Sequence, residues 1–323
     1  MSTETPFTEN TLYRPLGGTG LHVSLFGFGA WGIGGNTGGN SYGETDDNTS
    51  VAALHTAYEA GCTLFDTSHH FGDGHSESLL GQALAQWDRS RVVISTKASE
   101  RFAESQLREN LINSLKRLNT DYIDVYHLET PSMALIQLGK VFDVLARFQA
   151  EGLIRFGGIT IHDPQEGIQA SKHPVIGVIE APYHLFDRRI ETTLLPHLKQ
   201  TETAPGLFIR EPLANGFLTG KFLPDVCFTE GDWRTRWPKL YIQKRVSAVQ
   251  TVSDYARQIG SNVHHLALQF AQQAPGVSSV LVGCKTPEQV RQNIHALHTS
   301  LPVQDGDIDA SFVGLEAVLG QIF

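Results

Sequence analysis

An aspartate, two adjacent histidines and an aromatic residue follow a short apolar run in the first third of the chain. The apolar residues 64–65 are typical of the end of a buried strand, and Asp66 comes directly after them. His69, His70 and Phe71 then lead, through two glycines, to the predicted start of a helix. A carboxylate and two imidazoles at a strand end can hold and move protons. The segment therefore predicts a catalytic or binding site, although a polar loop between a strand and a helix would have a similar composition.

Two further titratable residues lie at the ends of later predicted strands. Lys97 ends the predicted strand 91–97, and His127 lies near the end of the predicted strand 122–128. If these strands are parallel, the side chains of Asp66, Lys97 and His127 meet at one end of the sheet. A buried lysine is costly without a partner, so we expect Lys97 to form an ion pair with Asp66. A solvated lysine at a strand exit and a hydrogen-bonded core histidine are the alternative interpretations.

The rest of the chain alternates short apolar runs with segments of helical periodicity. Strands are predicted at 23–30, 63–67, 91–97, 122–128, 154–160, 175–180, 206–210 and 277–282. Helices are predicted at 45–60, 76–86, 104–118, 140–151, 164–171, 194–200, 239–259, 263–273 and 287–297. Short apolar strands between amphipathic helices are typical of parallel strands buried on both faces. This number of units predicts an α/β fold, a closed (β/α)8 TIM barrel, and the glycine-rich turn within 12–23 adds an N-terminal β-hairpin.

An open, doubly wound sheet is the alternative fold, but no G-x-G-x-x-G motif opens the first predicted helix. The range 13–294 contains no linker or low-complexity segment, which predicts a single domain over residues 1–323. The segment 219–238 has no clear periodicity and is rich in Asp, Trp and Arg. Long loops of this kind usually have a function, and we expect this one to help bind a substrate.

The composition argues against several classes of partner. The net charge of −9 argues against nucleic acid and against an anionic membrane surface. Cys62, Cys227 and Cys284 are too far apart for a zinc motif or a disulfide framework, so no metal site is expected. Residues 1–10 lack the apolar core of a signal peptide, and no apolar run is long enough to span a bilayer. We expect a cytoplasmic protein that acts on a small-molecule substrate, and its oligomeric state stays open.

A series of motifs, in this order, resembles the aldo-keto reductase family. The matching segments are 16–24, 65–77, 95–97, 115–118, 121–127, 152–155, 212–221 and 283–289. The resemblance covers nearly all of the chain from Tyr13 to Leu297. It implies an NADP(H)-dependent oxidoreductase that transfers a hydride to or from the carbonyl or alcohol carbon of a small molecule.

The family's catalytic residues are an aspartate, a tyrosine, a lysine and a histidine. By position, the resemblance assigns these roles to Asp66, Phe71, Lys97 and His127. A phenyl ring therefore stands where the family has its tyrosine acid, and a phenyl ring has no proton to donate. General acid catalysis is typically worth roughly 10²–10⁴ in rate. We expect His70, His69, His127 or a bound water to supply the proton in its place.

The resemblance also indicates where the cofactor lies. Lys285, beside a helix predicted to begin at Pro287, suits a 2′-phosphate because a cation and free helix N–H groups both favour an anion. At the nicotinamide end, Ile161, Glu180 and Arg210 differ from residues common in the family. The expected cofactor-binding residues are Ala30, Trp31, Asp66, Thr160, Glu180, Arg210, Pro212, Leu213, Gly216, Lys221, Gly283, Lys285, Thr286, Gln289 and Asn293. The expected substrate-binding residues are Trp31, His70, Phe71, His127 and Trp233.

Two other functions stay open at this point. One is a non-redox lyase or epimerase that uses His70 or His127 as a base beside Lys97. The other is a non-catalytic subunit that senses NADPH and turns over slowly or not at all. Oxidation of bound NADPH by a carbonyl compound would distinguish the oxidoreductase from both.

Overall fold

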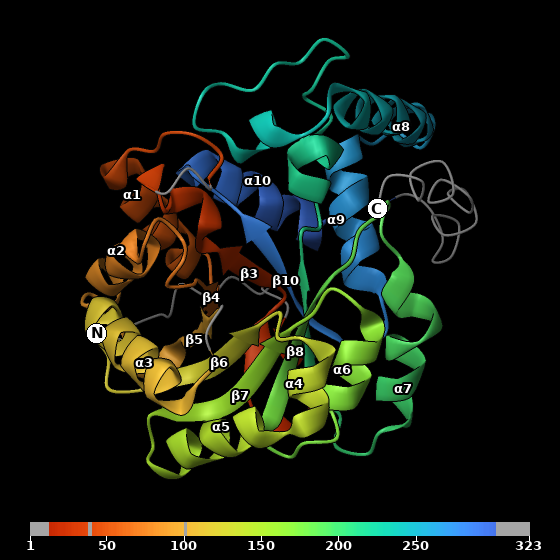
Figure 1. The fold of residues 1–323 in the computed structure, drawn as a ribbon. Coiled ribbons are helices and arrows are strands. Elements are labelled where there is room, and N and C mark those ends of the chain that lie inside the picture. The colour runs from red at the N-terminus through yellow and green to blue at the C-terminus, as the bar shows by residue number, and fades with distance from the viewer. Residues whose placement is uncertain (1–12, 38–40, 100–101, 302–323) are drawn as a thin grey trace, which may run out of the picture.

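A closed barrel of parallel strands forms the centre of the molecule in the computed structural model, which describes residues 13–37, 41–99 and 102–301 (Figure 1). In order around the barrel, the strands are β3 (Phe26–Gly29), β4 (Leu64–Asp66), β5 (Val93–Ala98), β6 (Ile123–Glu129), β7 (Ile154–Thr160), β8 (Ile176–Pro182), β9 (Gly206–Arg210) and β10 (Val277–Gly283). Strand β10 pairs in parallel with β3 and closes the ring. The predicted (β/α)8 TIM barrel is therefore confirmed.

Helices surround this barrel on its outer side (Figure 1). They are α1 (Asp47–Glu59), α2 (His75–Leu84), α3 (Glu104–Leu118), α4 (Met133–Leu138), α5 (Lys140–Ala150), α6 (Pro164–Ala170), α7 (Leu194–Gln200), α8 (Lys239–Gln258), α9 (Val263–Gln273) and α10 (Pro287–His298). The short helix α4 was not predicted, because six residues are too few to show a helical repeat. No helix among the described residues is both long enough and apolar enough to cross a membrane.

Side-chain caps and apolar stripes explain where the helices begin and which face they bury. The Asp46 carboxylate accepts a hydrogen bond of 2.7 Å from the backbone N–H of Thr49 at the start of α1. Thr286 caps α10 in the same way, as predicted. In α3 the buried residues include Leu107, Leu111 and Leu118, which lie on one face of the helix, toward the barrel.

The N-terminal end of the barrel is covered by an antiparallel hairpin of β1 (Tyr13–Pro15) and β2 (His22–Ser24), as predicted. Arg14 fastens it, because its guanidinium donates hydrogen bonds of 2.9 and 3.1 Å to the carbonyls of Gln272 and Val277. An apolar cluster fills the barrel beside the hairpin and contains Leu16, Val23, Leu64, Val93, Val125, Val178, Phe208 and Leu281. This packing leaves the C-terminal ends of the strands as the place for a site.

Candidate active site

The C-terminal ends of the strands line a cavity of about 1640 Å³. Successive strands from β4 to β9 each contribute one titratable or polar side chain to its wall. These side chains are Asp66, Lys97, Glu129, Thr160, Glu180 and Arg210. Because each comes from a strand of the barrel, the backbone that carries it is held by sheet hydrogen bonds on both sides.

Lys97 lies between two buried carboxylates. Its ammonium donates a short hydrogen bond to Oδ1 of Asp66, so the predicted ion pair is present. The same ammonium lies 2.9 Å from Oε2 of Glu180, on the other side of the barrel. Oδ1 of Asp66 also accepts a hydrogen bond of 2.7 Å from the Ser95 hydroxyl. One cation therefore serves two anions in a place from which water is largely excluded.

Burial and charge have opposing effects on the protons of this cluster. Burial alone would lower the pKa of Lys97, but the attraction of Asp66 and Glu180 outweighs it and raises the pKa above that of an ordinary lysine. Burial and the neighbouring Glu180 raise the pKa of Asp66 to about 7, against the opposing effect of Lys97. Burial would also raise the pKa of Glu180, but Lys97 lowers it below its ordinary value. The two carboxylates titrate as one coupled pair that competes for a single ammonium.

His127 lies below this cluster and is not part of the cavity wall. Its side chain is fully buried, and neither ring nitrogen has a hydrogen-bond partner among the described residues. Burial, and then the charge of Lys97, lowers the pKa of His127 to about 3, so the ring is neutral near pH 7. A Cβ on Gly158 would lie 2.5 Å from Nδ1 of His127, which shows how closely the barrel encloses the ring.

His127 lies deeper in the barrel than the cavity wall, and its expected role in catalysis and substrate binding stays a prediction. Strand β6 continues two residues beyond His127 and ends at Glu129, and the two side chains point to the same side of the strand. Glu129 therefore takes the position at the cavity wall, and His127 lies one layer deeper. Sequence reasoning missed Glu129 because it placed the strand end too early. Pro131, two residues after Glu129, was the available signal for the later end.

The two adjacent histidines after β4 take different positions. His70 lines the cavity, and its expected contact with a substrate stays a prediction. The Nδ1 atom of His69 lies 3.0 Å from the backbone carbonyl of Lys97, and its Nε2 atom lies 3.4 Å from the Ser99 hydroxyl. Burial lowers the pKa of His69. His69 therefore ties the loop to the end of β5, and His70 is the histidine that can contact a ligand.

Phe71 forms an aromatic part of the wall together with Trp31. The two rings are stacked with their centroids 6.1 Å apart. Two glycines fix the loop that carries Phe71, because a Cβ on Gly72 would lie 1.8 Å from the carbonyl oxygen of Gly34. Gly72 also has φ of 65°, a conformation that favours glycine. The position of the Phe71 ring is thus set by direct backbone packing.

Most of the residues expected to bind a cofactor line the same cavity. They are Trp31, Asp66, Thr160, Glu180, Arg210, Pro212, Leu213, Gly216, Lys221, Gly283, Lys285, Gln289 and Asn293. Ala30 and Thr286, which were expected to bind the cofactor, and Trp233, which was expected to bind the substrate, do not line it. Ala30 is fully buried, Thr286 caps α10, and Trp233 packs against Trp31 with ring centroids 5.5 Å apart. The structure places these residues, and their role in binding stays a prediction.

Lys285 lies beside the start of α10, where a phosphate could bind. Its ammonium donates hydrogen bonds of 2.9 Å and 3.3 Å to the carbonyls of Tyr42 and Glu44. Its backbone N–H donates a hydrogen bond of 2.7 Å to Oε1 of Gln289. The contacts hold the lysine side chain across the cavity edge, next to the first free N–H groups of the helix.

A metal is not needed to explain the buried carboxylates. Ligand atoms of Asp66, His127 and Glu180 lie within 4.8 Å of one another, which is a spacing that a cation could use. The ammonium of Lys97 already bonds to both carboxylates and provides the positive charge. The ammonium thus lies between the two carboxylates, where a metal cation would have to bind.

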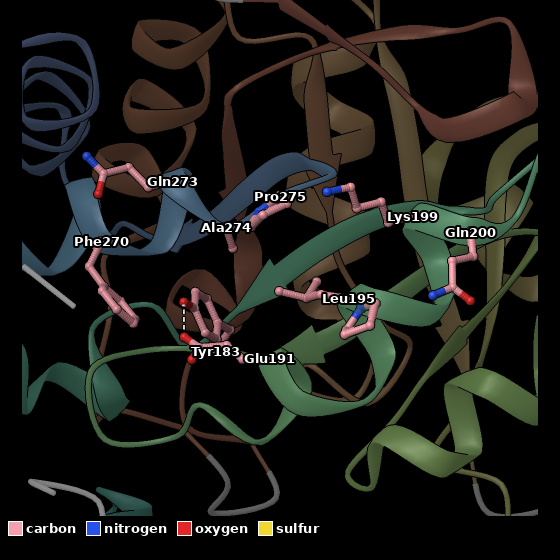
Figure 2. Close-up of a pocket in the computed structure, with 10 residues that line it drawn as sticks. Tyr183, Glu191, Leu195, Lys199, Gln200, Phe270, Gln273, Ala274 and Pro275 are labelled. Atoms are coloured by element: carbon pink, nitrogen blue, oxygen red, sulfur yellow. Dashed lines mark hydrogen bonds between the residues drawn. The ribbon is translucent and has the colours of Figure 1, made fainter. Parts of the chain in front are cut away.

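A second, smaller cavity of about 440 Å³ lies on the outside of the barrel, between α7 and α9 (Figure 2). Figure 2 shows the Tyr183 hydroxyl pointing at Glu191, to which it donates a hydrogen bond of 2.5 Å. Arg188 donates two more to the same carboxylate, at 2.9 and 2.8 Å. This carboxylate is fully engaged, whereas the first cavity holds the buried cluster of Lys97 with Asp66 and Glu180, so the first cavity is the candidate active site.

Comparison with known proteins identifies the family of the chain. The sequence profile described as the aldo/keto reductase family matches residues 26–310. The chain is 31% identical over 292 residues to the aldo-keto reductase YhdN of Bacillus subtilis (strain 168), with 86% of each chain covered. It is 27% identical over 320 residues to the NADH-specific methylglyoxal reductase of Escherichia coli (strain K12), with 91% of this chain and 96% of the relative covered.

A solved structure supports the fold in the same way. A glycerol dehydrogenase from Gluconobacter oxydans matches with a TM-score of 0.77 over 97% of this chain and 96% of that chain, at 22% identity. At this identity the likeness bears on the fold alone. The profile match, which spans most of the barrel, shows that the chain belongs to the aldo/keto reductase family of oxidoreductases.

Proposed function

We propose that the protein is an NADP(H)-dependent oxidoreductase that reduces a carbonyl group, or oxidises the corresponding alcohol, in a small molecule. We further propose that its active site works without the family's tyrosine acid, because Phe71 takes that position. The observation that carries the proposal is the buried cluster of Lys97 with Asp66 and Glu180 at the cavity wall. Such a cluster holds a positive charge at a fixed point where a developing negative charge needs it.

The cavity is suited to a dinucleotide. Its volume of about 1640 Å³ exceeds the roughly 300–1,000 Å³ of ordinary small-molecule pockets, so it has room for an extended cofactor and a substrate together. Lys285, Gln289 and Asn293 would hold the adenosine-phosphate end beside the start of α10. Thr160 and Glu180 would contact the nicotinamide end. When bound, the cofactor supplies the hydride donor or acceptor.

Residues of the chain would position the reacting groups. Arg210 presents a flat guanidinium at the wall, held by hydrogen bonds of 3.2 Å to the Ile161 carbonyl and 3.0 Å to the His162 ring. A planar cation of this kind can stack on an aromatic ring. Trp31 and Phe71 form the apolar side of the cavity, which favours a substrate with an apolar part next to its carbonyl.

A preference for NADPH over NADH follows from Lys285. Its ammonium is bonded to carbonyl oxygens that carry no net charge, so it is available to pair with a 2′-phosphate. The relative from Escherichia coli is named as NADH-specific, so cofactor preference differs among the proteins similar to this chain. Titration of the protein with each cofactor measures the preference directly.

A single-turnover experiment tests the proposed function. The protein is loaded with less than one equivalent of NADPH and mixed with a panel of aldehydes and ketones. We expect the nicotinamide absorbance to fall while an equal amount of alcohol forms. Product formation without any change in absorbance would instead indicate a lyase or epimerase. Tight NADPH binding without turnover on any carbonyl would instead indicate an NADPH-sensing subunit.

A further inference from the structure

We infer that Glu129 is the residue that gives a proton to the substrate oxygen during reduction and takes it back during oxidation. The inference rests on the proposed function. It names the acid that would take the place of the family's tyrosine, because the Phe71 ring has no proton to give. Glu129 is the last residue of β6 and lines the same cavity as Lys97 and Phe71. No comparison assigns a role to this side chain.

The position of Glu129 is fixed by its neighbours on both sides. In the barrel it pairs with Thr160, the last residue of β7, so it lies at the rim of the sheet. On the other side, the Ser68 hydroxyl donates a long hydrogen bond of 3.4 Å to Oε2 of Glu129. Among the described residues, no lysine or arginine forms an ion pair with Glu129. Its carboxyl group is therefore held at the wall but remains available to a ligand.

The other titratable groups on the wall are less suited to this role. Lys97 is bonded to two carboxylates. These carboxylates hold its protons, so Lys97 does not readily give one to the substrate oxygen. Asp66 is engaged by Lys97 and Ser95. His70 belongs to a loop, whereas Glu129 belongs to a barrel strand, which holds a catalytic group more precisely.

The surroundings of Glu129 favour its protonated form. Burial raises its pKa, and the negative charge of Glu180 on β8 adds to this effect. Lys97 on β5, His70 in the loop after β4 and Arg210 on β9 oppose it without reversing the direction. A carboxylic acid whose pKa is raised keeps its proton to a higher pH than usual, which suits it to act as a general acid.

In the reductive direction, the two ends of the carbonyl group receive a hydride and a proton. The substrate carbon accepts a hydride, and the electron pair of the carbon–oxygen double bond moves onto the oxygen. That oxygen takes the proton of Glu129, which leaves an alcohol and a Glu129 carboxylate. The carbonyl group is reduced, the nicotinamide is oxidised, and the carboxylate regains its proton from water.

Glu129→Gln tests the inference against two other variants. Glutamine keeps the size of the side chain and removes the exchangeable acid, Glu129→Asp keeps the acid, and Glu59→Gln changes an exposed carboxylate on α1 outside the cavity. In single turnover, Glu129→Gln should slow NADPH oxidation by roughly 10²–10⁴ and keep its affinity for NADPH within about threefold. The rate for wild type should fall as pH rises through the pKa of Glu129. Glu129→Asp should keep this alkaline limb, and Glu129→Gln should lose it.

Urea unfolding provides a second readout that does not depend on turnover. Because the folded pKa of Glu129 is raised, its contribution to wild-type stability is complete below the unfolded pKa of about 4.3 and is lost as pH rises through the folded value. Glu129→Gln should therefore lose less stability with rising pH than wild type and Glu59→Gln do. In the single-turnover experiment, the inference would be overturned if Glu129→Gln kept the alkaline limb of the pH–rate profile and a rate within about threefold of wild type. Identical pH dependence of unfolding in all the proteins would overturn it too, whereas failure of wild type to oxidise NADPH would refute the proposed function.

Discussion

Replacing Lys97 with methionine should destabilise the protein more than replacing either of its partners. Lys97 is the cation that bonds to both Asp66 and Glu180, and the three side chains are only 3%, 6% and 3% exposed. Methionine keeps much of the apolar stem and removes the charge, so two buried carboxylates remain without a cation. Asp66→Asn, in contrast, leaves Lys97 paired with Glu180.

The magnitude follows from the cost of an unpaired buried charge. Removing one partner of a buried ion pair typically costs about 3–5 kcal/mol. We expect that full amount for Lys97→Met, and roughly 1–3 kcal/mol for Asp66→Asn, whose amide can still accept a hydrogen bond. At roughly 2 °C per kcal/mol for a chain of this length, Lys97→Met should melt about 6–10 °C below wild type.

The stability that Lys97→Met loses relative to wild type should grow as the pH rises. Asp66 has a pKa raised to about 7, so its contribution to wild-type stability already falls between roughly pH 4 and pH 7. Without the ammonium of Lys97, burial and mutual repulsion raise the folded pKa of Asp66 further and bring that of Glu180 from below to above its ordinary value, whereas the unfolded values stay at about 3.9 and 4.3. The unfolded variant then binds fewer protons than the folded variant. The difference in stability from wild type is therefore larger near pH 8 than near pH 5.

Urea unfolding followed by circular dichroism, at several pH values, measures both effects. Lys116→Met is the matched control, because Lys116 is exposed on α3, and we expect a change within about 0.5 kcal/mol. Greater stability of Lys97→Met than of Asp66→Asn would refute the reasoning. The reasoning would also be refuted if Lys97→Met lost the same stability near pH 5 as near pH 8, because the three side chains would then not form a buried network of charges.

Three further predictions concern single side chains at or near the cavity. In the Glu129→Gln background, which lacks the inferred acid, Phe71→Tyr should raise the rate of reduction of a nitrobenzaldehyde by roughly 10- to 1000-fold over Glu129→Gln alone and over Phe71→Leu in the same background, and no gain would show that a hydroxyl at position 71 does not reach the substrate oxygen. Lys285→Ala should weaken binding of NADPH far more than binding of NADH in titration calorimetry, and an equal loss for both would contradict the phosphate site. His127→Leu should change kcat/KM by less than about threefold and the free energy of unfolding by less than about 1 kcal/mol, because neither ring nitrogen has a hydrogen-bond partner in the described structure. A large loss of activity in His127→Leu would place this residue in the reaction.

The fold could be predicted closely from local patterns. The bounds of β7, β9, α3 and α9 agree with the prediction from sequence, because each of these segments has a clear period and ends at a capping residue, a glycine or a polar break. The parallel order of the strands followed from their alternation with helices. Helix α4 was not predicted, because its six residues are too few to show a helical repeat and resemble a loop.

The depth of a side chain within the barrel could not be predicted in the same way. His127 and Glu129 lie on the same side of β6, so alternation cannot decide which of them reaches the cavity. Which of the two side chains reaches the cavity depends on how far β7 extends beside β6. The pairing of Glu129 with Thr160 shows that both strands extend as far as Glu129. Likewise, the contact of Lys97 with Glu180 joins β5 to β8, which are not neighbours, and only closure of the barrel brings them together.

Transfer of a deuterium label tests the central claim most directly. Wild type is loaded with NADPH that carries deuterium at the hydride-donating position of the nicotinamide, and it is allowed one turnover with an aldehyde. We predict an alcohol with the deuterium on its carbinol carbon, in an amount equal to the NADPH consumed. An unlabelled product, or a product formed while the labelled nicotinamide stays intact, would contradict it.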